Sequence, residues 1–133
     1  MTPILIGIAG ALLLIISFEI LKQFNKDSIY ALTLSGIGFL YVGYTWTDTP
    51  TVIVTCIQAI IFVLIAYYGL LKNPYILAAG YFLHGLWDIV YHFWFDASLI
   101  PPHYDWFCSS LDFTVGIYLI VIIMKKKLSA AAI

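Results

Sequence analysis

The stretch HGLWDIVYH, residues 84–92, lies in one of the most apolar parts of the chain, yet it places three ionisable side chains four residues apart. On a helix His84, Asp88 and His92 advance by about 40° per step, so they form one slanted stripe. Ionisable groups inside a long apolar helix usually face the interior of a membrane-embedded bundle. The stretch therefore predicts a membrane helix with an inward polar face.

The composition of the whole chain supports a membrane protein. Of its 133 residues, 63% are hydrophobic and 10% are charged, whereas soluble domains average about 25% charged residues. The net charge is −1 and arginine is absent, which excludes nucleic acid as a partner because binding it needs a basic surface. We expect a single transmembrane domain over residues 1–133, with the lipid bilayer as its main partner.

Five segments are long and apolar enough to cross a bilayer as helices, which takes about 20 residues each. Three of them begin with a capping residue followed by proline, at Thr2-Pro3, Thr49-Pro50 and Asn73-Pro74. Because the connections are short, consecutive helices should be antiparallel neighbours. The prediction is an all-α bundle with spans at about 3–24, 29–46, 50–71, 74–95 and 104–124.

The charged residues at the span ends predict the orientation. All six lysines lie at the ends of the first, third and fifth spans, and in a five-span chain these ends lie on one side. The positive-inside rule makes that side cytoplasmic, and tryptophans cluster at the opposite boundary. We therefore expect an external N-terminus and a cytoplasmic C-terminus, in a multi-pass protein of the cytoplasmic membrane.

Polar residues of three spans fall at a similar depth. Asp88, Asp112 and Gln58 each lie about 10 Å inside the outer ends of their spans, at 1.5 Å per residue. This depth predicts a polar pocket between the third, fourth and fifth helices that opens to the outer side.

Histidine nitrogens and carboxylate oxygens suit zinc and similar divalent ions. His84 and His92 are about 12 Å apart along the axis, too far to share one ion easily. The hypothesis is a zinc-like site built from Asp88 with one of these histidines and completed by Asp112. Such a site activates water, so we expect hydrolase-like chemistry on a lipid or small apolar substrate, with Asp88, Asp112 and His84 as catalytic residues. The accessory candidates are Cys108, Gln58, His103, Trp87 and Tyr91.

Two other functions use the same residues. A chain of Asp and His groups can relay protons in a transporter or channel. Alternatively, the polar groups only tie helices together in a structural or partner-binding module. Gly36 and Gly43, one heptad apart, favour close helix packing within the chain or in a homodimer. We expect Cys56 and Cys108 to be two free thiols rather than a disulfide.

The motifs HGLWDIVYH and FCSSLDFTVGIYL (107–119) resemble those of a group of small, uncharacterised bacterial integral membrane proteins with an HGxWDxxxH and CxxxDxxxG pattern. This resemblance covers roughly residues 80–120 and implies a small polytopic protein of the bacterial inner membrane. A looser likeness joins the chain to membrane zinc hydrolases of the alkaline ceramidase and adiponectin-receptor type, which also place His, Asp and Ser among helices. This chain has fewer spans, fewer histidines and no matching serine, so that likeness is an analogy alone.

Overall fold

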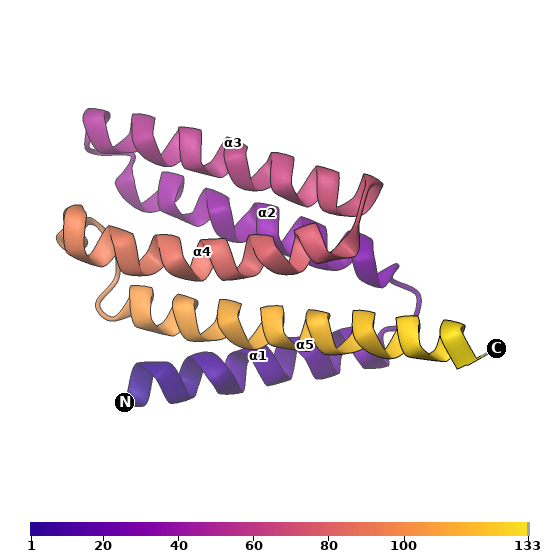
Figure 1. Cartoon of the computed structure of the whole chain (residues 1–133). Coiled ribbons are helices and arrows are strands. Elements are labelled where there is room, and N and C mark those ends of the chain that lie inside the picture. Colours follow the sequence, from indigo (N-terminus) through magenta and orange to yellow (C-terminus); the bar gives the residue numbers. More distant parts are fainter. Residues whose placement is uncertain (133) are drawn as a thin grey trace.

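The computed structural model describes residues 1–132, which form five α-helices and one short 3-10 helix. The predicted all-α architecture is confirmed. The helices run alternately in opposite directions, so the N-terminus and the α2–α3 and α4–α5 connections share one end of the bundle (Figure 1). We call this the N-terminal end, and the opposite end, where all six lysines lie, the lysine end. The elements are α1 (Thr2–Ile20), α2 (Lys26–Thr45), α3 (Thr49–Leu71), α4 (Pro74–Trp94), η1 (Ala97–Leu99) and α5 (Tyr104–Ala132).

The helix boundaries follow from local capping. Asn73 caps α4 as predicted, since its side chain accepts a hydrogen bond from the Tyr75 amide at 2.9 Å. The predicted caps of the other two proline-led helices are wrong: α1 and α3 already include Thr2 and Thr49, and Asp48 caps α3. The Asp48 carboxylate was available one residue earlier and neutralises the positive end of the helix dipole better than a hydroxyl does.

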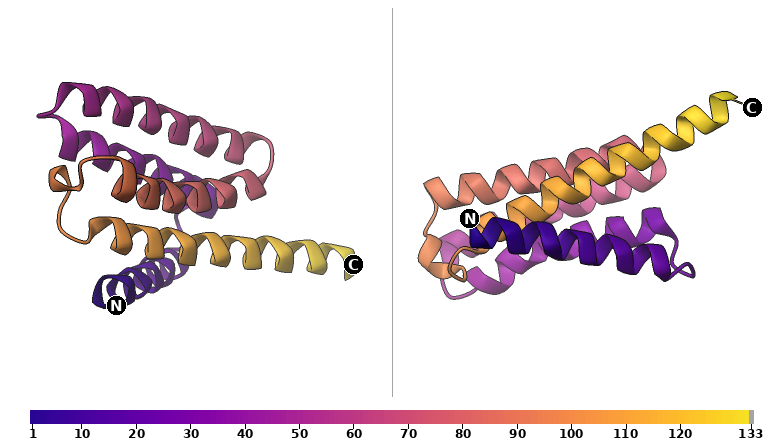
Figure 2. Two further views of the ribbon diagram at one scale, coloured as in Figure 1. Left: turned by 60° about the vertical axis from the view of Figure 1, so that its left-hand side comes forward. Right: turned by 90° about the horizontal axis from the view of Figure 1, so that it is seen from below.

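Two helices differ from the predicted spans in length. α1 ends at Ile20, before residue 24, because the chain turns there and the Asn25 side chain caps α2 by accepting from the Ser28 amide at 3.0 Å. α5 continues past residue 124 to Ala132, since lysine, leucine and alanine all favour helix. Its last turns project beyond the neighbouring helices (Figure 2).

The packing confirms three of the four expected neighbour pairs. α2 packs on α3, α3 on α4 and α4 on α5, but α1 packs along α5 instead of α2. The expectation for α1 was wrong because close packing depends on small residues rather than on a short connection. An added Cβ at Gly7 would lie 2.3 Å from the Phe107 carbonyl oxygen, so the glycine allows the two backbones to touch. Gly36 and Gly43 have no such neighbour within 4 Å and face outward from α2.

Apolar side chains lie on the outer faces of the bundle. Helices α1, α3 and α5 are each long and apolar enough to cross a membrane. Large hydrophobic side chains are exposed along the helices, whereas His84, Asp88 and Asp112 are fully buried. These buried residues lie between two apolar groups: the group toward the lysine end includes Leu34, Leu77 and Val115, and the other includes Tyr41, Tyr91 and Tyr104.

Candidate metal centre

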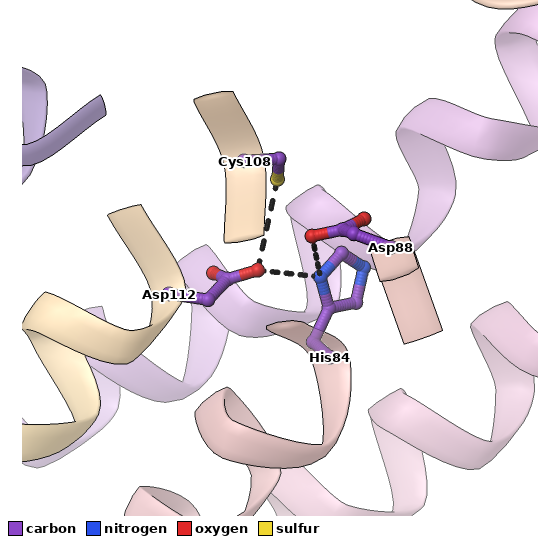
Figure 3. Close-up of side chains that lie close together, drawn as sticks. All are labelled: His84, Asp88, Cys108 and Asp112. Atoms are coloured by element: carbon purple, nitrogen blue, oxygen red, sulfur yellow. Dashed lines mark hydrogen bonds and ion pairs between the residues drawn. The ribbon is translucent and has the colours of Figure 1, made fainter. Parts of the chain in front are cut away.

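Four side chains from α4 and α5 meet in the interior of the bundle. His84 and Asp88 are four residues apart on α4, and Cys108 and Asp112 are four apart on α5, so each pair lies on one helix face. In Figure 3 the carboxylates of Asp88 and Asp112 both face the same nitrogen of the His84 ring, Nδ1, and Cys108 lies beside Asp112. His84, Asp88 and Asp112 have no solvent exposure and Cys108 has 3%. We call these four residues the buried cluster.

The distances within the buried cluster suit a small ion. Bonds of about 2.0–2.3 Å at a tetrahedral zinc imply donor atoms about 3.3–3.7 Å apart. The distance from His84 Nδ1 to Asp88 Oδ2 is 3.6 Å, and that from Cys108 Sγ to Asp112 Oδ2 is also 3.6 Å. His84 Nδ1 and Asp112 Oδ2 are 2.7 Å apart and share a hydrogen bond, so an ion would take the place of this proton and separate the atoms by about 0.6 Å or more. One potential ligand atom from each residue lies within 4.8 Å of the others, so the cluster could hold a metal ion.

A tyrosine on a third helix orients one carboxylate. Tyr41 on α2 is fully buried, and its hydroxyl donates to Asp88 Oδ1 at 2.6 Å. The other oxygen, Oδ2, faces His84 and has no hydrogen-bond partner; Asp112 Oδ1 also has none. Buried polar atoms normally have a partner. A carboxylate that binds a metal ion commonly accepts a hydrogen bond on one oxygen and leaves the other oxygen for the ion.

The charge of the buried cluster also needs compensation. With a neutral imidazole and thiol, the two carboxylates carry a charge of about −2, which is costly in an apolar interior. Either two protons or one divalent ion would neutralise it. No lysine lies near enough to help, because all six are at the lysine end.

Glycine and serine hold the two helices close beside the buried cluster. The Ser109 hydroxyl donates to the carbonyl oxygen of Gly85 at 3.0 Å. An added Cβ at Gly85 would meet the Phe113 ring at 3.2 Å. This approach of α4 to α5 lets the short Asp112 side chain reach across to His84.

His92 lies apart from the buried cluster. Its Nδ1 pairs with a carboxylate oxygen of Asp105 nearer the N-terminal end, and the His92 side chain is 36% exposed. Asp105 is 5% exposed at its side chain. Of the two histidines considered for sharing an ion with Asp88, the structure therefore brings His84 to Asp112 and leaves His92 in a second His–Asp pair.

The accessory candidates lie in different places. Cys108 belongs to the buried cluster. Gln58 on α3 is buried, and its amide nitrogen can donate to the carbonyl oxygens of Gly38 and Thr55 rather than to the cluster. α3 therefore contacts the cluster through the apolar ring of Phe62, whose centroid lies 4.7 Å from that of the His84 ring, and not through Gln58. The hydrogen bond from Tyr41 to Asp88 joins the cluster to α2.

The remaining candidates lie toward the N-terminal end. Trp87 and Tyr91 pack their rings on Tyr41, and the Tyr91 hydroxyl donates to the Asp96 carbonyl oxygen at 3.2 Å. His103 is exposed in the α4–α5 connection. Both cysteines are free thiols.

Tyr41, Asp105 and Phe62 were not among the candidates. The positions of Tyr41 and Phe62 carry no spacing signal: Tyr41 is one of ten tyrosines, and it reaches Asp88 because of how α2 packs against α4. Asp105 could have been found, since it is three residues before Cys108 on the polar face of α5.

This buried acidic cluster, in an all-α bundle with apolar outer faces, defines a helical protein with a potential ion site in its interior. Residues 2–125 match a family of unknown function (DUF6010), and the chain belongs to that family. No curated protein and no solved structure matches the chain.

Proposed function

We propose that the protein crosses the bacterial cytoplasmic membrane five times, with the N-terminal end outside and the lysine end in the cytoplasm. Apolar outer faces and interior charges support this placement, because lipid favours the first and excludes the second. Helices α2 and α4 are also about as long as a membrane span, and their polar side chains include the buried Tyr41, His84 and Asp88. The lysines at one end support the orientation.

We propose further that the buried cluster binds one divalent, zinc-like ion. The observation that carries this proposal is the meeting of four buried potential ligand atoms within 4.8 Å. His84, Asp88 and Asp112 would hold the ion. Cys108 would be a fourth ligand, or would stand beside a position left for water.

Bound in this way, a divalent ion polarises substrates and activates water. The chain supplies the surroundings: Tyr41 holds Asp88, Phe62 covers one side of the His84 ring, and the helices exclude bulk water. Such a site fits hydrolase-like chemistry on a lipid or a small apolar molecule. The protein would then be a metal-dependent membrane enzyme.

Metal titration of stripped protein tests the binding proposal. Zn²⁺ added to protein in detergent should raise the melting temperature of the wild type and of Asp27→Asn, whose residue is exposed on α2. The same titration should leave Asp112→Asn unchanged. An equal response of Asp112→Asn and wild type would show that zinc binds elsewhere.

A second candidate function is proton-linked transport. The observation that favours it is the second pair, His92 with Asp105, one helical turn from Asp88 and Cys108 on the way to the N-terminal end. The His92–Asp105 pair and the buried cluster would together carry protons from outside into the bundle. Toward the lysine end, Glu19 pairs with Lys26 at 2.6 Å and with Tyr118. Flux of protons into liposomes that Asp88→Asn abolishes in metal-free protein would support transport.

The homodimer and the structural role also remain proposals. Gly36 and Gly43 face outward and leave room for a second copy on α2. If Asp88→Asn and Asp112→Asn lower stability and change neither metal content nor flux, the buried cluster fixes helix packing.

A further inference from the structure

A large cavity lies at the N-terminal end of the bundle, between the start of α1 and the segment that leads into α5. Its volume is about 910 Å³, within the range of pockets that hold small ligands. The walls come from residues 1–4 and 6, at the start of the chain and of α1, and from residues 101–104, 106 and 107. The buried cluster does not line it.

The shape of the cavity follows from the crossing of α1 and α5. At Gly7 the backbones touch, with the Phe107 carbonyl oxygen 2.3 Å from where a Cβ would be. The cavity is lined by Phe107 and by residues of α1 that precede Gly7, so it lies on the N-terminal side of this contact. An acyl chain would enter from the N-terminal end or from the side and stop there.

The wall opposite α1 is held in a fixed conformation. Pro101 and Pro102 restrict the backbone, and His103 follows with φ of 61°, which is uncommon outside glycine. Ile100 is buried at 6% exposure and anchors this connection among the tyrosines of the core. The cavity is therefore preformed by rigid backbone, as ligand sites usually are.

The chemistry of the walls indicates the occupant. Ile4, Ile6 and Phe107 supply apolar surface, and Trp106 supplies an amphipathic ring of the kind found at membrane interfaces. Two polar side chains on the wall, Thr2 and His103, lie at or just before the start of α1 and α5. This arrangement matches a molecule with an apolar tail and a polar head near the membrane surface.

One wall residue also joins the cavity to the buried cluster. Tyr104 lines the cavity and is 9% exposed, and its hydroxyl has no hydrogen-bond partner. Its ring packs on that of Tyr41 at 5.7 Å, and Tyr41 holds Asp88. Tyr104 is one turn before Cys108 on α5. A molecule in the cavity would thus contact a residue that packs on Tyr41, the tyrosine bonded to Asp88.

We propose that this cavity binds one acyl chain of a lipid from the outer leaflet, with the lipid head beside His103. The inference rests on the proposed membrane placement and not on a bound metal. Lipid drawn from the bilayer fits better than a water-soluble ligand because the walls are mainly apolar and face the membrane boundary.

Photo-crosslinking in vesicles tests this proposal. The protein is reconstituted in phosphatidylcholine vesicles with either a diazirine-labelled fatty acid or phosphatidylcholine carrying the same labelled chain, and adducts are mapped by mass spectrometry. We expect adducts concentrated in residues 1–10 and 101–107. The two probes distinguish a free fatty acid from a phospholipid as the source of the chain.

A variant whose cavity is filled by a larger side chain can be compared with a matched control. Ile4→Trp should lower the adduct yield at residues 101–107 at least five-fold, whereas Leu13→Trp, at an exposed position of the same helix, should not change it. If Ile4→Trp fails to fold, Ile6→Trp makes the same test. Adducts that follow apolar exposure evenly over all helices, or that persist when the cavity is filled, would overturn the proposal.

Two further measurements separate this inference from the proposed function. Resistance to alkaline carbonate extraction tests membrane placement, so a membrane-bound protein with evenly spread adducts would refute the cavity site alone. Asp88→Asn should keep the adduct pattern of the wild type, because the cavity does not depend on metal.

Discussion

The hydroxyl of Tyr41 donates a 2.6 Å hydrogen bond to Oδ1 of Asp88, joining residues 47 positions apart on α2 and α4. The bond leaves Asp88 Oδ2 directed at His84, 3.6 Å from Nδ1. Tyr41 thereby fixes which oxygen of Asp88 is available to the buried cluster. A side chain outside the ligand set thus controls the geometry of the candidate metal site.

Removing this hydrogen bond should weaken metal binding. Tyr41→Phe keeps the ring but frees Asp88 to rotate, and loss of such an outer partner typically costs 10–100-fold in metal affinity. We expect a drop of about that size in competition with a chelating dye. Tyr44→Phe, on the same helix, is the matched control and should bind like the wild type. Equal affinities of Tyr41→Phe and the wild type would show that Asp88 is not a ligand.

Removing the ion should destabilise the bundle. A ligand at about 100 times its dissociation constant stabilises the folded state by about 2.7 kcal/mol, so a chelator should lower the melting temperature of metal-loaded protein. His84→Asn should melt lower from the start and show no chelator effect. The exposed His103→Asn should respond like the wild type. A chelator effect that survives in His84→Asn would assign the ion to another site.

Much of the fold could be predicted from sequence, because hydrophobic length, prolines and lysines are local signals. The helix order, the boundaries of α3 and α4 to within one residue, and the meeting of Asp88 and Asp112 with one of the two α4 histidines all follow from such signals. The spacing of i and i+4 residues indicates which side chains share a helix face.

The parts that could not be predicted depend on three-dimensional packing. The position of α1 against α5 depends on the backbone contact at Gly7, and one glycine among nine carries no mark of that role. The link from Tyr41 to Asp88 likewise depends on how α2 leans on α4. The pairing of His92 with Asp105 was missed because His92 had been considered as a ligand beside Asp88.

Because the backbones touch at Gly7, we expect a glycine-to-alanine substitution to destabilise the protein at this position but not at an exposed glycine. In Gly7→Ala the new Cβ would lie 2.0 Å from Ser110 Oγ and 2.3 Å from the backbone oxygen of Phe107, which cannot rotate away. We expect a loss of about 1–3 kcal/mol in the free energy of unfolding, as for other overpacked sites. Gly36→Ala has open space around it and should be neutral or stabilising by up to about 1 kcal/mol. Equal stabilities in urea-induced unfolding in detergent would contradict the observed packing of α1.

The proposed orientation predicts which ends of the protein are accessible from outside the cell. In a Cys56→Ser background, whose remaining Cys108 is buried, His103→Cys should react with a membrane-impermeant maleimide on intact cells. Lys126→Cys should react after the membrane is opened. The reverse pattern would invert the topology, and labelling of both sites on intact cells would contradict a membrane-spanning bundle.

The most direct test of the metal site is elemental analysis of the purified wild-type protein and Asp112→Asn, each in detergent without added metal. A metal centre built from His84, Asp88, Cys108 and Asp112 predicts about one zinc or similar divalent ion per wild-type chain and a several-fold lower content in folded Asp112→Asn. Wild-type protein without stoichiometric metal, which also fails to take up Zn²⁺, Fe²⁺, Mn²⁺ or Co²⁺ on titration, would contradict it.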